Sequence, residues 1–494
     1  MIAIAQIQLE PLDWIVFICY ALAMLLIGWF YSHKNKTNED YLLGGRSMNP
    51  TAVGVSLFAT LLSTLSYLTY PGEMIRHGPL IFMGLLAFPL IYYVGGWWLI
   101  PRIMKMNVTS AYEILEHKLG LRVRMFGIFM FLSLRILWMS TIIYMTVEIA
   151  LLPIIQFDST YIPYVGILLT GITIIYTTMG GLRGVVVTDV LQSIIFLVGA
   201  ILCIVIISFQ LGSVIEIFPK QWMDHWDTLH LGFDPLKRTT LGNAVIALFV
   251  WYLCTLGSDQ MAIQRYLSTA NVKAARKSFG ISLITNIISY ILLALVGLAL
   301  LAYFTINKNL LLPQKSLYDQ ADTLFPRFIL IALPAGVTGL LIAGLLAAAM
   351  SSMSSGLNSV SSVIYEDIIR RFRKEKIGNN NALKQVKRIS YLTGAMVIAI
   401  SFLINKVSGN LFDVVMKVVN LFVAPMFVLF FMALFVSFAT EKGTLIGGMV
   451  AIFVAIGVAF FQIFGITVLW IMPTSLIVGI TVGILISYLD TKLA

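Results

Sequence analysis

The sequence has 494 residues, of which 59% are hydrophobic and only 11% are charged. Soluble domains carry about 45–50% apolar and about 25% charged residues. The composition therefore excludes a soluble enzyme, a nucleic-acid-binding protein and a disordered chain, and it indicates a protein of the lipid bilayer. The net charge of +10 has to be explained by where the basic residues lie.

Apolar stretches long enough to cross hydrocarbon, about 20 residues each, occur thirteen times along the chain. The first one has no basic region before it and no cleavage site after it, so we expect a retained span rather than a signal peptide. Together they predict an all-α polytopic membrane protein. The stretches are 12–31, 50–70, 79–101, 122–150, 160–179, 184–209, 239–262, 275–304, 325–356, 388–405, 411–437, 441–461 and 466–489.

The basic residues predict the orientation, because cytoplasmic loops carry an excess of Lys and Arg. With the N-terminus outside, 23 of the 33 Lys and Arg residues fall in inside segments and eight in outside segments. This places the C-terminus inside and assigns the positive excess to anionic lipid headgroups rather than to nucleic acid. No feature of the sequence calls for an obligatory protein partner. The outside segment 210–238 is long enough for a small ordered cap, and we expect the inside segment 364–388 to extend the preceding helix before a turn at its Gly-Asn run.

Polar residues interrupt three predicted spans, where polar side chains are costly and usually functional. Six hydroxyl side chains lie around the whole circumference of the predicted span 50–70. So many hydroxyls favour a discontinuous helix that lines a cavity over a continuous helix whose hydroxyls bond back to its own backbone. A hydroxyl row on one face of 325–356 is typical either of a hard-cation site, such as sodium, or of a small-residue packing seam. The carboxylate of Asp189 is favoured as a cation ligand over a solvated interfacial group. The hydroxyl residues are Ser56, Thr60, Ser63, Thr64, Ser66 and Thr69 in the first span, and Ser351, Ser352, Ser354 and Ser355, after Ala348, in the second.

A second polar interruption, at 257–260, closes the span that opens near residue 239 and lies five spans after 50–70. Interrupted helices at corresponding positions of two five-span units are typical of inverted-repeat transporters. Arg135, a lone cation within a span, is expected to meet either an anionic solute or an acid such as Glu148. The chain has no Ser-His-Asp, Walker or glycine-rich nucleotide pattern, and its three cysteines lack pair spacing, so no enzyme, disulfide framework or metal cluster is predicted.

Four segments, "DYLLGGR", "IYTTMGGLRGVVVTDVLQ", "SDQMAIQRYLS" and "AAAMSSMSSGLNSVSS", resemble the solute:sodium symporter family, and the resemblance runs from about residue 12 to 440. It implies the inverted five-helix repeat fold first known from a bacterial leucine transporter, a place in the cell membrane, and sodium-coupled uptake of a small organic solute. The implied division is an N-terminal helix and loop at 1–49, a first repeat at 50–209, an external loop at 210–238, a second repeat at 239–437 and two further helices at 438–494.

The resemblance also implies two Na⁺ sites. The first would use the backbone carbonyls of Ala59, Leu62 and Ala348 with the hydroxyls of Ser351 and Ser352. The second, found in some members, would use Asp189, Ser351, Ser354 and Ser355.

The solute site departs from the pattern of the family's sialic acid transporters, in which three hydroxyls, a glutamine and an arginine hold the solute. The matching positions here hold Ser63, Ser66, Leu61, Leu85 and Trp138, with Arg135 one turn away. These departures count against sialic acid and favour a smaller or more apolar solute, such as a monocarboxylate or sugar-like acid if Arg135 turns inward. The alternatives are a symporter of a neutral sugar or other solute, and a transporter-like sensor lacking its kinase domain.

Overall fold

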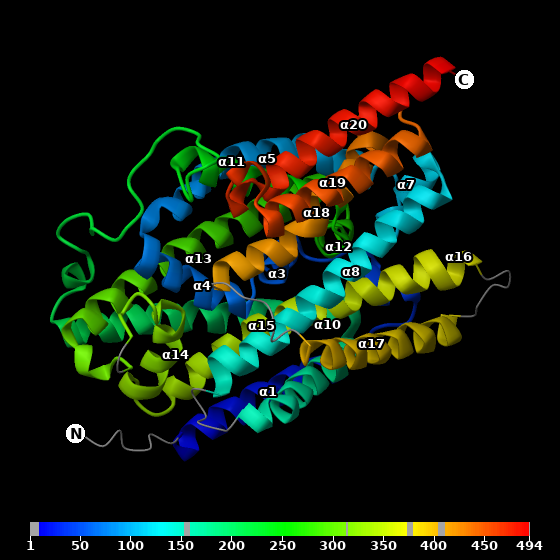
Figure 1. The fold of residues 1–494 in the computed structure, drawn as a ribbon. Helices are drawn as coiled ribbons and strands as arrows, with labels where there is room; N and C mark the ends of the chain where they lie inside the picture. The colour runs from blue at the N-terminus through cyan, green and yellow to red at the C-terminus, as the bar shows by residue number, and fades with distance from the viewer. Residues whose placement is uncertain (1–8, 153–158, 313–314, 373–378, 404–410, 494) are drawn as a thin grey trace.

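The computed structural model describes all residues except 1–8, 153–158, 313–314, 373–378, 404–410 and 494, and within this described part every regular element is a helix. Long helices lie roughly alongside one another, with the two termini at opposite ends of the molecule (Figure 1). The α-helices are α1 Pro11–Ser32, α2 Asn38–Leu43, α3 Pro50–Leu61, α4 Thr64–His77, α5 Phe88–Tyr93, α6 Ile100–Met104, α7 Tyr112–Leu119, α8 Leu121–Met145, α10 Ile162–Leu211, α11 Leu241–Ser258, α12 Gln260–Leu267, α13 Val272–Ile306, α14 Ala321–Ala332, α15 Val337–Val363, α16 Arg370–Phe372, α17 Asn379–Ser401, α18 Leu411–Phe435, α19 Glu441–Phe461 and α20 Ile471–Leu493.

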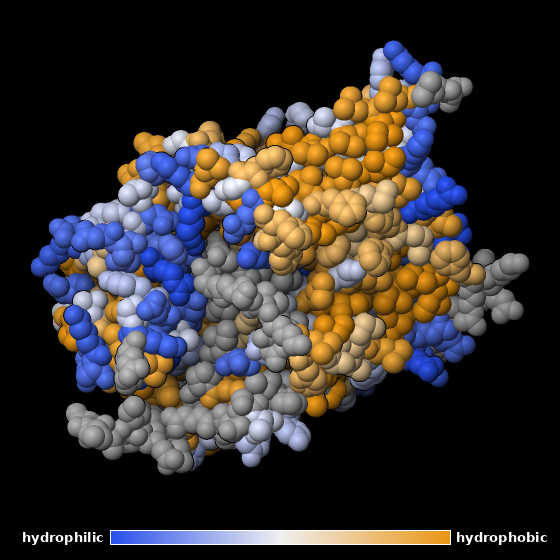
Figure 2. All heavy atoms as spheres, viewed as in Figure 1, coloured by the Kyte–Doolittle hydropathy of each residue, from blue (hydrophilic) through white to orange (hydrophobic). Residues whose placement is uncertain are grey.

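The outer surface matches a membrane protein. Among the described residues, nine helices are long and apolar enough to cross a bilayer, or ten if α3 and α4 form one bent span. Large apolar side chains such as Leu26, Ile284 and Phe453 are exposed on their outer faces. Figure 2 shows these apolar surfaces as a broad belt between two hydrophilic ends. Such a belt is stable against lipid, where helices satisfy their own backbone hydrogen bonds.

Two helices are broken where the sequence predicts interruptions. Leu62 and Ser63 adopt extended backbone angles between α3 and α4, and the two helices meet at a bend of 66°. Asp259 is extended between α11 and α12, and its Oδ1 accepts a hydrogen bond of 2.9 Å from the Met261 N–H, which caps α12. The predicted discontinuous helix at 50–70 and the interruption at 257–260 are therefore confirmed.

The helix α15 lies at the centre of the molecule (Figure 1), and nearly all of its side chains are buried. Its Gly, Ala and Ser residues allow neighbouring helices to approach closely. The predicted span 325–356 is wrong at its start, because α14 ends at Ala332 and α15 begins only at Val337. Leu333 is extended, as expected for a residue that precedes a proline, and Pro334 follows it.

The predicted spans 160–179, apart from its first two residues, and 184–209 are joined in α10, which kinks at Gly181 with φ of 57°. A side chain there would meet the Tyr41 ring 2.7 Å away, so the position requires glycine both for its backbone angle and for close packing.

The predicted outside segment 210–238 is ordered and packs against the end of α4. Trp226 is buried, and its Nε1 donates to the Ile75 carbonyl at 3.3 Å. Asp227 meets His77 and Arg238, each at 3.2 Å. Burial alone would raise the pKa of Asp227, but the hydrogen bond with His77 and the charge of Arg238 lower it below its ordinary value. This segment therefore forms the small ordered cap expected from its length.

The predicted inside segment 364–388 begins as a continuation of α15, since helical structure extends through Phe372. Of the Gly-Asn run where the turn was predicted, Gly378 lies outside the described residues, and the asparagines that follow it are already helical. Helical structure resumes with α17 at Asn379.

The last two long helices, α19 and α20, pack through glycines. A Cβ atom at Gly447 would lie 2.7 Å from the Gly479 carbonyl oxygen and 2.9 Å from the Gly483 Cα. Because both neighbours are backbone atoms of α20, they cannot move aside as a flexible side chain would.

We expect Gly447→Ala to lower the stability of the protein by about 1–3 kcal/mol, the usual cost of overpacking. The measurement is the thermal unfolding midpoint of the purified protein in detergent. Gly171→Ala is the matched control, because Gly171 lies in α10 with no neighbouring atom within 4 Å of the added methyl group. Equal midpoints for the two variants would contradict close backbone packing of α19 on α20.

Candidate functional site

The break between α3 and α4 leaves carbonyl oxygens that meet the serine face of α15. The Ser351 hydroxyl donates to the Ala59 carbonyl at 3.2 Å and to the Ala348 carbonyl at 3.1 Å. The Ser352 hydroxyl donates to the Leu62 carbonyl at 2.7 Å. The structure thus brings together all five positions that the family resemblance implied for a first sodium site.

These oxygens border a small void of about 10 Å³, which Ala59, Leu62, Ala348 and Ser351 help to line. A void of about 10–15 Å³ holds one water-sized occupant. A serine hydroxyl can rotate its proton away and offer a lone pair instead. The cluster can therefore accept a single small cation that prefers neutral oxygen ligands.

A second cluster surrounds Asp189, which is fully buried. The Ser56 hydroxyl donates to Asp189 Oδ2 at 2.6 Å, and the Arg265 guanidinium lies 3.4 Å from the same oxygen. Asp189 Oδ1 has no hydrogen-bond partner within the described part of the chain. The Ser354 hydroxyl donates to the Ser351 carbonyl at 3.0 Å. In the Asp189 carboxylate, Oδ2 therefore has two partners, whereas Oδ1 has none among the described residues.

Arg265 was missed by the sequence reasoning, which counted it among the inside basic residues. The structure buries its side chain completely in α12, where it donates to the hydroxyls of Ser56 and Ser355 and pairs with Asp189. Ser355 also hydrogen-bonds Thr60 at 3.0 Å. Arg265 therefore links α3, α10, α12 and α15 at the place where a second sodium ion was expected.

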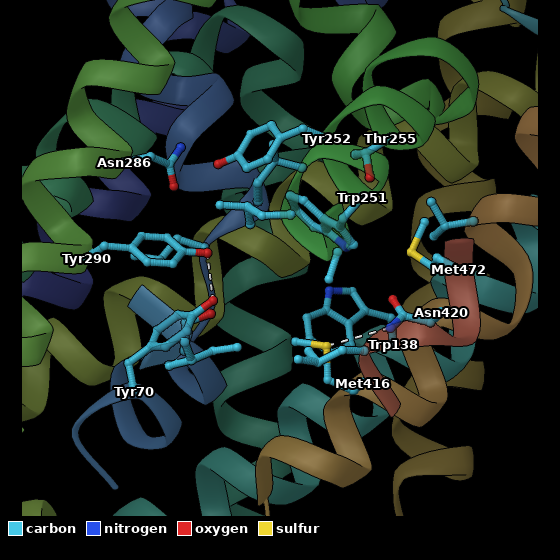
Figure 3. Close-up of a pocket in the computed structure, with 18 of the residues that line it drawn as sticks. Tyr70, Trp138, Trp251, Tyr252, Thr255, Asn286, Tyr290, Met416, Asn420 and Met472 are labelled. Carbon is cyan, nitrogen blue, oxygen red and sulfur yellow. Dashed lines mark hydrogen bonds between the residues drawn. The ribbon is translucent and has the colours of Figure 1, made fainter. Parts of the chain in front are cut away.

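A larger cavity of about 130 Å³ opens next to the broken helices (Figure 3). Five large aromatic residues belong to its wall, and the hydroxyls of two of them, Tyr70 and Tyr290, hydrogen-bond each other there at 2.6 Å. The other large aromatic residues of the wall are Trp138, Trp251 and Tyr252.

Arg135 is the charged residue among those that line this cavity. Its guanidinium forms an ion pair with the Asp259 carboxylate, and both side chains are buried. Of the two partners expected from the sequence, an anionic solute or an acidic side chain, the structure shows an acidic side chain, and it is Asp259 in the α11–α12 break rather than Glu148. The charge of Arg135 at the cavity wall is therefore offset by a fixed anion.

Three polar atoms of the cavity-lining residues have no hydrogen-bond partner among the described residues: Thr255 Oγ1, Asn420 Oδ1 and Arg135 Nε. Leaving a buried polar group unpaired costs about 1–3 kcal/mol. They come from α11, α18 and α8, and these atoms are themselves buried within the wall of the cavity.

Four of the six predicted solute residues line the cavity, namely Leu61, Ser66, Arg135 and Trp138. Ser63 and Leu85 are not among the lining residues. Ser63 lies in the α3–α4 break with its hydroxyl unpartnered within the described residues, and Leu85 is partly buried against the core. Their role in solute binding stays a prediction.

Two polar residues of the wall, Asn286 and Asn420, were not singled out from the sequence. Each is an amide within a predicted apolar span, at 275–304 and 411–437. The criterion that selected Asp189 would therefore have found both.

Comparison with known proteins gives the family. Residues 41–451 match the sodium:solute symporter family. The chain belongs to this family. A sodium/sialic acid symporter of Proteus mirabilis is 30% identical, and the match covers 89% of this chain and 88% of that protein. A sodium-coupled monocarboxylate transporter of Xenopus laevis is 27% identical over 88% of this chain and 70% of its own length.

A solved structure supports the same fold. It is a Na⁺-coupled sialic acid symporter in a substrate-bound outward-open state, with a TM-score of 0.84, 27% sequence identity, and coverage of 97% of this chain and 98% of that one. As a sodium:solute symporter, the protein is a multi-pass protein of the cell membrane that uses Na⁺ as its coupling ion. The resemblance drawn from the four sequence segments is thereby confirmed.

The buried pair of Arg135 and Asp259 allows a direct test. We expect Arg135→Gln or Asp259→Asn alone to destabilise the protein by about 3–5 kcal/mol, because each leaves an uncompensated buried charge. The asparagine can still cap α12, so the loss reports the charge. The double variant should regain much of that stability. The measurement is thermal unfolding of all four proteins, and additive losses would contradict a direct ion pair.

Proposed function

We propose that the protein couples inward Na⁺ flow to uptake of a small organic solute by alternating access. The observation that carries the proposal is a pair of hydrogen bonds between α15 and the α3–α4 break. The Ser351 and Ser352 hydroxyls donate to the carbonyls of Ala59 and Leu62. A sodium ion at Ala59, Leu62, Ala348, Ser351 and Ser352 would join the broken helix to α15. The ordered break would then complete the cavity wall at Leu61 and Ser66.

A second sodium ion is proposed at Asp189 with Ser351, Ser354 and Ser355. The free Oδ1 of Asp189 supports this proposal, since a carboxylate oxygen without a donor is a natural cation ligand. Arg265 now donates to Ser355 and pairs with the other carboxylate oxygen. Sodium entry therefore requires the guanidinium to withdraw from Ser355.

The number of ions decides how strongly a solute can be concentrated. One charge moved through 100 mV is worth about 2.3 kcal/mol, and a tenfold concentration ratio is worth about 1.4 kcal/mol. Two ions thus supply about 7 kcal/mol, enough to accumulate a neutral solute about 100,000-fold, whereas one ion gives only a few hundredfold.

One candidate solute is a monocarboxylate or a sugar-like acid, as the names of the relatives suggest. A neutral polar solute is the second candidate, and the Arg135–Asp259 ion pair favours it, because a carboxylate would have to displace Asp259 from a buried partner. The aromatic and polar residues that share this wall suit a molecule with hydroxyl groups on a ring that can stack. A sialic acid is less favoured, because its carboxylate would also have to displace Asp259 from Arg135.

We further propose thirteen spans, with the N-terminus outside, the C-terminus inside and two five-helix repeats at 50–209 and 239–437. The bent pair α3–α4, the kink in α10, and the helices α17 and α18 supply the spans beyond the nine clear ones. The breaks at residues 62–63 and at Asp259 fall at corresponding positions of the two repeats, as an inverted repeat requires.

Uptake by the purified protein in proteoliposomes tests the sodium coupling. We expect an inward sodium gradient to drive uptake of at least one solute in a panel of D-glucose, pyruvate, lactate and N-acetylneuraminate. Ser352→Ala should raise the half-activating sodium concentration about tenfold, the equivalent of about 1.4 kcal/mol, because it removes one proposed ligand.

Ser359→Ala is the control, since that buried hydroxyl lies on the same helix but donates to the Gly356 carbonyl at 3.0 Å. Uptake that ignores sodium for every solute would contradict the coupling. Equal effects of Ser352→Ala and Ser359→Ala would contradict the proposed ligand.

The second site predicts a sodium Hill coefficient near two that falls toward one in Asp189→Asn. The asparagine can still accept from Ser56 but carries no charge, and Arg265 loses its anion, so stability is measured in parallel. Ser354→Ala is a second variant expected to fold, because it removes no charge and its hydroxyl donates to the Ser351 carbonyl of its own helix. An unchanged coefficient in both variants, measured from uptake at varied sodium concentration, would contradict a second ion.

A further inference from the structure

The connection between α19 and α20 reaches the large cavity. After α19 ends at Phe461, Gln462, Phe464 and Gly465 all have positive φ angles, so the chain reverses sharply. The Thr467 N–H then donates to the Pro235 carbonyl at 3.0 Å, which fastens the connection to the cap segment 210–238. The following residues run into the cavity wall.

Two side chains of this region line the cavity, Leu469 and Met472. Both are buried. Figure 3 shows Met472 among the side chains that line this cavity, together with Asn420 and Thr255, the residues that carry two of the three unpartnered polar atoms. The cavity wall therefore combines the apolar side chains of Leu469 and Met472 with polar residues.

A separate apolar cluster supports this wall. Ile471, between the two lining residues, is fully buried against Ala455, Val458 and Ala459 of α19. These contacts hold the start of α20 on α19, while Met472 itself packs in the main apolar core.

The wall also lies beyond residue 451, where the match to the family ends. We propose that Leu469 and Met472 are specificity-determining residues, which form an apolar wall of the solute site and select solutes that present an apolar edge next to hydrogen-bonding groups. The proposal rests on the proposed function, since it assumes that the solute occupies this cavity. It predicts that solute preference and sodium activation can change independently.

Thiol labelling tests the wall without knowledge of the solute. Met472→Cys in the full-length protein in detergent should react with a charged methanethiosulfonate reagent at least about tenfold faster than Ile477→Cys. Ile477 lies on the same helix with its side chain exposed on the apolar outer surface. Intact mass, with the unsubstituted protein as the baseline for its three cysteines, counts the added label. Equal rates would overturn the placement of Met472 in a water-filled cavity.

Uptake tests the selectivity. For the best-transported member of the panel above, Leu469→Ala and Met472→Ala should each raise the half-saturating concentration about tenfold, as expected for lost apolar contact in a pocket. The half-activating sodium concentration should stay within twofold, and Ile477→Ala should change neither value. A parallel shift in sodium activation, or no shift in the solute constant, would overturn the proposal. Wild-type uptake indifferent to sodium would instead refute the proposed function, while the labelling result would still decide the wall.

Discussion

The structure depends on one constraint, that a backbone inside hydrocarbon must find hydrogen-bond partners within the protein. A continuous helix meets this requirement by itself, but the break between α3 and α4 does not. The freed carbonyls of Ala59 and Leu62 are met by Ser351 and Ser352 of α15, and the Thr64 hydroxyl in turn donates to the Leu345 carbonyl at 2.6 Å. The break is therefore possible only because α15 presents small polar residues at that depth, and the same oxygens supply the proposed ion site.

The second broken helix is stabilised by charge instead of hydroxyls. Asp259, in the break, caps α12 through one oxygen and holds Arg135 of α8 through the other. Six residues later, Arg265 pairs with Asp189 of α10. In both of these pairs each buried charge has an opposite charge as its partner, which avoids the cost of an isolated ion in an apolar interior. The consequence for transport is that the cavity beside these pairs is close to electrically neutral.

Much of this organisation could be predicted from the sequence, because a polar residue in an apolar span is a strong local signal. That signal located the α3–α4 break, the serine face and the buried Asp189. It failed where the information is not local. The identity of the acid beside Arg135, the burial of Arg265 and the contribution of Met472 to the cavity all depend on packing between helices far apart in the chain. The late start of α15 was missed because the apolar pattern continues across Pro334, whose effect is on the backbone rather than on hydropathy.

The burial of Arg265 also constrains how the chain is assembled during synthesis. Arg265 follows Asp189 by 76 residues and precedes Ser355 by 90. When α12 enters the membrane, its carboxylate partner is already present, but one of its hydroxyl partners has not yet been made. The nascent chain must therefore bring α12 against α3 and α10 early, and the arrival of α15 completes the coordination of the guanidinium. A single arginine in this way imposes an order on the insertion of the two halves of the protein.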